Sequence, residues 1–131
     1  MNYLSPFKAV RRRLNISGTN EKERVTMSYA EFEALIRLLL RAVKFDEAWY
    51  LKEYPDVEEA VRKGTYKSAQ HHFIAEGYFE GRRPCEMEID ESWYLKSNPD
   101  VAAGIRTGRI PSAKEHFSEH GYVEGRLPFE F

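Results

Sequence analysis

The chain has 131 residues, of which 42% are hydrophobic and 31% charged, and its formal net charge is −1. This composition is ordinary for a globular protein, excludes a wholly disordered chain, and holds no run near the roughly 18 apolar residues that a membrane-spanning helix needs. The single cysteine, Cys85, excludes an intrachain disulfide framework and fits a reducing compartment, so we expect a cytoplasmic location.

The charge is distributed unevenly along the chain. Residues 1–44 hold nine Lys or Arg against four Asp or Glu, whereas residues 45–131 hold eleven against seventeen. This asymmetry indicates a basic arm on an acidic body. An acidic body repels phosphates, so nucleic acid is not an expected partner.

Residues 1–27 are predicted to be a basic arm and linker. Ser5 and Pro6 are placed to start a short helix, with Ser5 as its cap, and apolar residues follow at spacings of three and four. One interpretation is a frayed terminal turn, which the short length favours. The other is a helix that docks on a partner or on the inner membrane face, with three candidate binding residues: Arg11, Arg12 and Arg13. No apolar stretch with a cleavage site precedes it, so a secretory signal is not expected.

Residues 28–43 give the clearest single helix. Ser28 and Glu31 have the spacing of a capping box, and Met27 and Phe32 that of a hydrophobic staple. The apolar stripe is wide enough that we expect burial on more than one side. This segment, 28–44, is predicted to cap the repeats that follow, within one helical domain spanning 28–131.

A forty-residue segment occurs twice, as Phe45–Pro84 and, 44 residues later, as Ile89–Pro128. Aligned without a gap, 21 of the 40 positions are identical, so this is an internal repeat, with repeat 1 at 45–88 and repeat 2 at 89–131. No stretch alternates with period two, so strands are not expected. The predicted fold class is all-α, with a capping helix and two tandem 44-residue repeats of short helices.

Each copy is predicted to hold three short helices, described here for the first copy. Asp46 caps the first, Pro55 opens the second and Gly64 ends it in a left-handed conformation. Ser68 caps the third, which is predicted to end at Gly77. The counterparts lie 44 residues further on.

The repeated apolar positions are predicted to form one packed array. If Gly77 and Gly121 lie just past a helix end, the tyrosine that follows each packs back on a phenylalanine. The expected core residues are Trp49, Leu51, Val57, Phe73, Tyr78, Trp93, Leu95, Val101, Phe117 and Tyr122.

Six repeated side chains are candidate binding residues: Tyr50, His72, Arg82, Tyr94, His116 and Arg126. The two histidines invite a metal or acid–base interpretation, but no ligand cluster supports it and hydrogen bonding within helices is favoured. The arginines suit a carboxylate or phosphate, although pairing with the nearby glutamates is favoured. Repeated aromatic rings suggest platforms for sugars, whereas large aromatics at repeat spacing are more typical of a core.

The acidic residues near predicted helix starts admit general acid–base roles, but capping explains them and recurs with each copy. No phosphate loop, nucleophile elbow or metalloprotease helix is present. We therefore expect no enzymatic activity and no catalytic residue, metal or cofactor.

The motif residues stand most completely in the second copy, as Asp90-Glu91-Ser92-Trp93-Tyr94-Leu95, then Asn98-Pro99-Asp100-Val101, His116-Phe117, and Gly121 to Pro128. This pattern resembles a repeat of bacterial cell-surface polysaccharide proteins, often appended to glycosyltransferases. The first copy departs from it, with Tyr54 in place of Asn98. The resemblance implies an accessory, non-catalytic unit, and the glycosyltransferase domain itself has no counterpart in the chain.

Taken together, these patterns predict a non-enzymatic helical interaction or scaffold module that binds a protein partner of the envelope polysaccharide machinery, with the N-terminal arm contacting that partner or a membrane surface. One alternative is a carbohydrate-binding module that uses the repeated aromatics. The other is an enzyme or metal site in which His72 and His116 face one pocket.

Overall fold

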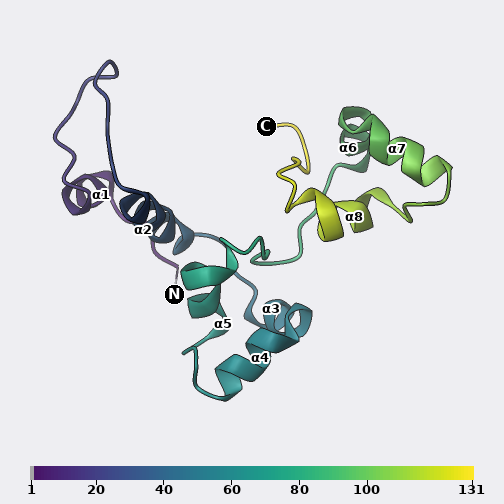
Figure 1. Cartoon of the computed structure of the whole chain (residues 1–131), viewed down its shortest axis with the longest axis horizontal. Coiled ribbons are helices and arrows are strands. Elements are labelled where there is room, and N and C mark those ends of the chain that lie inside the picture. The colour runs from purple at the N-terminus through teal and green to yellow at the C-terminus, as the bar shows by residue number, and fades with distance from the viewer. Residues whose placement is uncertain (1) are drawn as a thin grey trace.

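The computed structural model describes residues 2–131, and its regular structure is entirely helical (Figure 1). Two helices, α1 (Phe7–Arg13) and α2 (Tyr29–Leu40), come first. They are followed by α3 (Glu47–Glu53), α4 (Pro55–Arg62), α5 (Ala69–His72) and a π-helical turn, η1 (Phe73–Gly77). The same series then recurs as α6 (Glu91–Ser97), α7 (Pro99–Arg106), α8 (Ala113–His116) and η2 (Phe117–Gly121). The predicted all-α class is confirmed.

The helix starts form where local capping predicts them. Asp46 and Asp90 accept hydrogen bonds from the backbone N–H groups of Trp49 and Trp93, at 3.0 and 2.9 Å. Ser68 and Ser112 cap α5 and α8 in the same way, and a proline stands at the first position of α4 and of α7. Each cap satisfies a backbone donor that a helix start leaves unpaired.

The predicted helix ends are half right. Gly64 follows α4 with φ of +80°, as expected for a left-handed terminator. Gly77 is the last residue of η1, so the third helix ends where it was predicted to end, but the chain turns left-handed only at Gly81, with φ of +85°. The second copy repeats this difference, with the left-handed turn at Gly125.

The predicted packing of Tyr78 on Phe73 is nevertheless present. The two ring centroids lie 6.2 Å apart in an edge-on arrangement, and Phe117 and Tyr122 repeat it at 6.2 Å. The contact therefore comes from the π-helical turn, which places the tyrosine back over the phenylalanine, rather than from a left-handed glycine at position 77.

Helix α2 is capped as predicted but is less buried. Ser28 accepts a hydrogen bond from the backbone N–H of Glu31 at 3.1 Å, as a capping box requires, and donates its hydroxyl to the Glu31 carboxylate at 3.1 Å. Leu40 is buried, whereas Tyr29 and Phe32 are 73% and 46% exposed, so burial is less complete than predicted. Ile36 and Leu40 pack in the first core, while Leu38 lines a small cavity together with residues of α1, so the helix is partly covered from two sides.

The first copy anchors α2 through one arginine. The Arg37 guanidinium donates to the carbonyl oxygen of Ala75 in η1 at 2.9 Å and lies over the Phe79 ring, 4.6 Å from its centroid.

Within residues 2–131, no helix is both long enough and apolar enough to span a bilayer.

Each copy has its own core, rather than sharing one continuous array. Tyr50, Val57 and Phe73 are buried in the first copy, joined by Leu40 of α2. Tyr94, Val101 and Phe117 are buried in the second. The copies lie apart in Figure 1, joined by the linker that follows Pro84. The centres of these cores are the two tyrosines, which sequence reasoning assigned to binding.

The two tryptophans that were predicted to be core residues are less buried than the tyrosines beside them. Trp49 is only partly buried and packs at the edge of the first core. Trp93 is also partly buried, but among the described side chains it is not one of those that pack against the second core. Tyr78 is 40% exposed, so its predicted core position is wrong as well. Leu51 and Leu95 flank the two cores as partly buried side chains.

The N-terminal arm lies against α2. The backbone N–H of Tyr3 donates to the Arg41 carbonyl at 3.0 Å, and Leu14 is buried although Phe7 is 75% exposed. Pro6, not Ser5, occupies the cap position of α1, and no side chain caps it. Tertiary contacts thus hold a helix that is too short to be stable alone.

Candidate functional site

The two recurring histidines lie in the interior of their own copies. The phenol oxygen of Tyr50 is 3.0 Å from Nδ1 of His72, and Tyr94 is 2.9 Å from His116. His72 is only 4% exposed. Burial lowers the pKa of both imidazoles and raises the pKa of both phenols, so each pair is neutral at pH 7.

This geometry agrees with the structural interpretation of the histidines. Each imidazole is held by a tyrosine of its own copy, and neither lines the cleft between the copies. A catalytic pair made of His72 and His116 has no support in this arrangement.

The recurring arginines are occupied by internal ion pairs. Arg82 donates from both terminal nitrogens to the carboxylate of Asp56, at 2.9 and 2.7 Å, and from Nε to Glu80 at 2.9 Å. Arg126 makes the same contacts with Asp100 and Glu124. The arginine hydrogen bonds lower the pKa of both aspartates. Because both guanidinium groups already bind carboxylates within the protein, they are not free to bind a phosphate or carboxylate of a ligand. This agrees with the pairing to nearby glutamates that the sequence analysis favoured.

The repeated aromatic residues do not form open platforms. Tyr50 and Tyr94 have no exposed surface, so the candidate binding role assigned to them is wrong. The Arg83 guanidinium covers Trp49, 5.0 Å from its ring centroid, and Tyr54 packs edge-on against the same ring. A carbohydrate site built on these repeated rings is therefore not supported.

The arginines of α1 are placed differently from one another. Arg11 folds back to donate to the carbonyl oxygen of Gly18 at 2.9 Å, and its guanidinium lies 5.8 Å from the centroid of the Phe7 ring. Arg12 and Arg13 remain exposed beside a small cavity against α2. Only these two keep their charges available to a partner.

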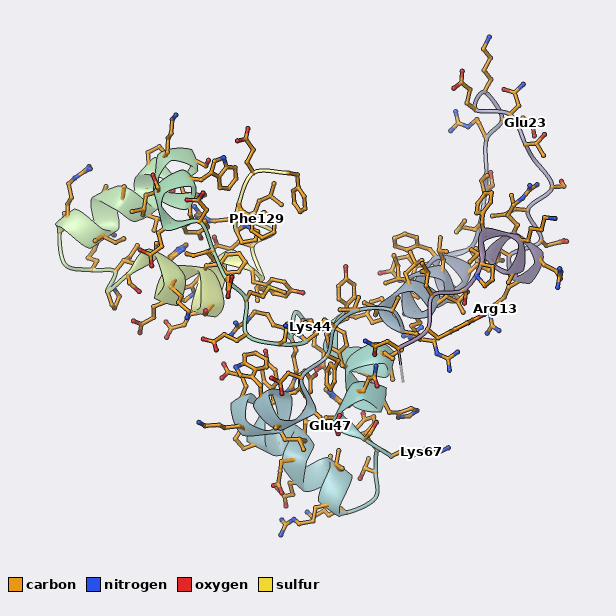
Figure 2. All side chains as sticks on the ribbon, turned by 180° about the vertical axis from the view of Figure 1, so that it is seen from behind. Arg13, Glu23, Lys44, Glu47, Lys67 and Phe129 are labelled. Atoms are coloured by element: carbon orange, nitrogen blue, oxygen red, sulfur yellow. The ribbon has the colours of Figure 1, made fainter. Side chains whose placement is uncertain are left out.

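A cleft of about 1070 Å³ lies between the two copies. It forms where the turns after η1 and η2 approach each other, so that a Cβ atom at Gly81 would lie 3.2 Å from Cγ2 of Val123. Figure 2 shows Phe129 beside the second copy and Lys44 where α2 leads into the first, and both residues line the cleft.

The wall of the cleft is mainly apolar and open to solvent. Val123 is 67% exposed, Leu127 46% and Phe129 44%. The other apolar side chains of the lining are Tyr78, Phe79, Met87, Phe117, Tyr122, Pro128 and Phe131. Apolar surface that is gathered in one hollow, instead of scattered, is typical of a binding site.

Charged groups are set around this apolar wall. The lining holds Glu80, Glu86 and Glu88 together with Lys44 and Arg126. Three of these groups already form ion pairs, Glu80 with Arg82, Glu86 with Lys114 and Arg126 with Glu124. Burial raises the pKa of the Tyr122 phenol, which stays neutral. The lining holds no histidine, and its chemistry suits binding of an apolar segment.

Sequence reasoning missed this cleft. Its walls come from the residues after each Glu-Gly-Arg turn, from the linker and from the C-terminal tail, and these have no common periodicity. The available signal was the cluster Leu127, Phe129 and Phe131, an apolar tail following the last recognisable helix.

Comparison with known proteins adds no further constraint: no family model, curated protein or solved structure matches this chain.

Proposed function

We propose that the protein is a non-enzymatic interaction module, which binds a segment of a partner protein in the cleft between its two copies. The observation that carries the proposal is the exposed apolar wall formed by Val123, Leu127 and Phe129. An extended or helical segment with apolar anchors would bury these side chains, which are otherwise left in water. A basic residue beside the anchors would meet Glu88 at the rim.

The likeness of the repeat to that of polysaccharide-associated bacterial proteins indicates the kind of partner. We propose a glycosyltransferase or an export component of the envelope polysaccharide machinery. Arg12 and Arg13, exposed on α1, supply a second contact to that partner or to an anionic membrane surface.

Site-specific photo-crosslinking in the native host tests the proposal. A benzophenone amino acid at Val123 places the reactive group in the cleft, and the same residue at Tyr29, which is exposed on α2, is the matched control. The expected result is a discrete product from position 123 that contains a protein of the polysaccharide machinery and is absent from position 29. Leu127→Asp in the same chain should abolish it, because a charge would replace apolar contact surface.

Two results would overturn the proposal. Equal products from both positions would show that the crosslinks are unspecific. A product at position 123 that contains only a second copy of this chain would replace the proposed partner with self-association.

A further inference from the structure

A cluster of three potential metal ligands lies in the first copy, away from the cleft lining except for Glu80. His72, Glu76 and Glu80 are four residues apart along α5, η1 and the turn that follows, so they share one side of the chain. One ligand atom from each lies within 4.8 Å of the other two. We propose that these three side chains bind a single Zn²⁺ ion, with water completing its coordination.

The position of the His72 imidazole suits it to bind a metal. The side chain of His72 is 5% exposed, and its Nδ1 is held by the Tyr50 phenol at 3.0 Å. Its Nε2 points to Glu80 at 3.9 Å, which is beyond hydrogen-bond range.

Each carboxylate also has an outer partner that orients it. The Tyr66 phenol donates to the carboxylate of Glu76, and Nε of Arg82 donates to one oxygen of Glu80 at 2.9 Å. Outer contacts of this kind orient metal ligands in known sites. The Glu80 oxygen that accepts from Arg82 is also the one that lies 3.9 Å from Nε2 of His72, so the second oxygen would bind the ion once the carboxylate turns. Asp56 offsets the arginine charge through two hydrogen bonds.

Comparison with the second copy shows which of these residues the repeat fold itself requires. Its Tyr94–His116 and Glu124–Arg126 pairs repeat those of the first copy. At the positions of Tyr66 and Glu76, however, the second copy has Ile110 and His120. The Tyr66–Glu76 pair is thus not required to build the fold. The second copy keeps possible ligands at the three matching positions, as His116, His120 and Glu124, but among the described residues only the first copy brings its ligand atoms within 4.8 Å of one another.

The chemistry of the ligands favours zinc. One imidazole nitrogen and two carboxylate oxygens are common Zn²⁺ ligands, whereas Ca²⁺ and Mg²⁺ prefer oxygen alone. In a tetrahedral zinc site the ligand atoms stand about 3.4 Å apart. Exposed glutamate ends can close the remaining distance by rotating their side chains, since both carboxylates face solvent.

Calorimetric titration of the untagged full chain with ZnCl₂, after treatment with a chelator, tests the proposal. We expect one ion per chain, and Co²⁺ in place of Zn²⁺ should give visible absorption bands. Glu76→Gln and Glu80→Gln should each weaken binding at least about tenfold, and Tyr66→Phe about tenfold through loss of orientation. Glu124→Gln is the matched control: it breaks the corresponding arginine pair in the second copy and should leave the affinity unchanged.

Substituting glutamates, instead of the buried His72, keeps the fold intact in the test. Absence of binding at millimolar Zn²⁺ would overturn the proposal. So would binding that survives both Glu76→Gln and Glu80→Gln, or that is lost equally in Glu124→Gln, because either would place the ion elsewhere.

Discussion

Gly77 lies directly against the phenol oxygen of Tyr50. A Cβ atom at this position would collide with that oxygen and would stand 3.2 Å from two atoms of the His72 ring. Gly121 has the same relation to Tyr94. The recurring glycine of the third helix is therefore required for close approach of side chains and not for a left-handed backbone.

Gly77→Ala is expected to destabilise the protein by about 1–3 kcal/mol, because the added methyl group overpacks the first core. Urea unfolding monitored by circular dichroism measures the loss. The double variant Gly77→Ala with Tyr50→Phe removes the colliding oxygen, so its loss should be smaller than the sum of the two single losses. Additive losses would contradict the proposed contact.

Tyr50→Phe and Tyr94→Phe should each cost about 1–3 kcal/mol of unfolding free energy. Each change keeps the ring but leaves a buried imidazole nitrogen without its partner. Tyr78→Phe is the control, since this tyrosine is 40% exposed and should change stability by less than about 0.5 kcal/mol. Similar losses in all three variants would show that the hydroxyl–imidazole hydrogen bonds contribute no more to stability than the exposed hydroxyl of Tyr78.

Stability should fall in mild acid because of the buried imidazoles. Burial lowers the pKa of His72 and His116 in the folded chain, so the unfolded chain binds protons more readily. Their contribution is complete above the unfolded pKa of about 6.5 and is lost as the pH falls toward the folded pKa. Unfolding free energies measured between pH 7.5 and pH 5 check this.

A His71→Gln variant serves as the control for that experiment, because His71 is exposed and both buried imidazoles remain. It should show the same loss as the parent chain. A free energy of unfolding that stays constant down to pH 5 would show that protonation of His72 and His116 does not destabilise the fold.

The second copy allows a direct comparison of two neighbouring aromatic residues. Tyr94→Ala should cost about 3–5 kcal/mol, as truncations of buried aromatics do, because its ring has no exposed surface. Trp93→Ala should cost clearly less, since the indole is only partly buried. The unfolding midpoints of the two variants show which loses more stability. A larger loss for Trp93→Ala would show that the tryptophan is a core residue after all.

From α2 onward, the sequence alone was sufficient to predict where helices begin, whereas at α1 it placed the cap one residue too early. The capping residues Asp46, Ser68 and Ser28, and the proline at position 55, act on backbone groups within three residues of themselves. Their effect is therefore visible in any short window. The terminator at Gly64 is equally local, because the left-handed conformation excludes most other residues.

Only the tertiary structure decided which aromatic residue fills each core and what lies between the copies. Trp49 and Tyr50 are adjacent, so their side chains point about 100° apart on the helix, and periodicity over seven residues is too short to choose between them. Gly77 has its role because Tyr50 approaches from another helix. The cleft, likewise, exists only once the turn at Gly81 meets Val123, a contact between residues that no local pattern connects.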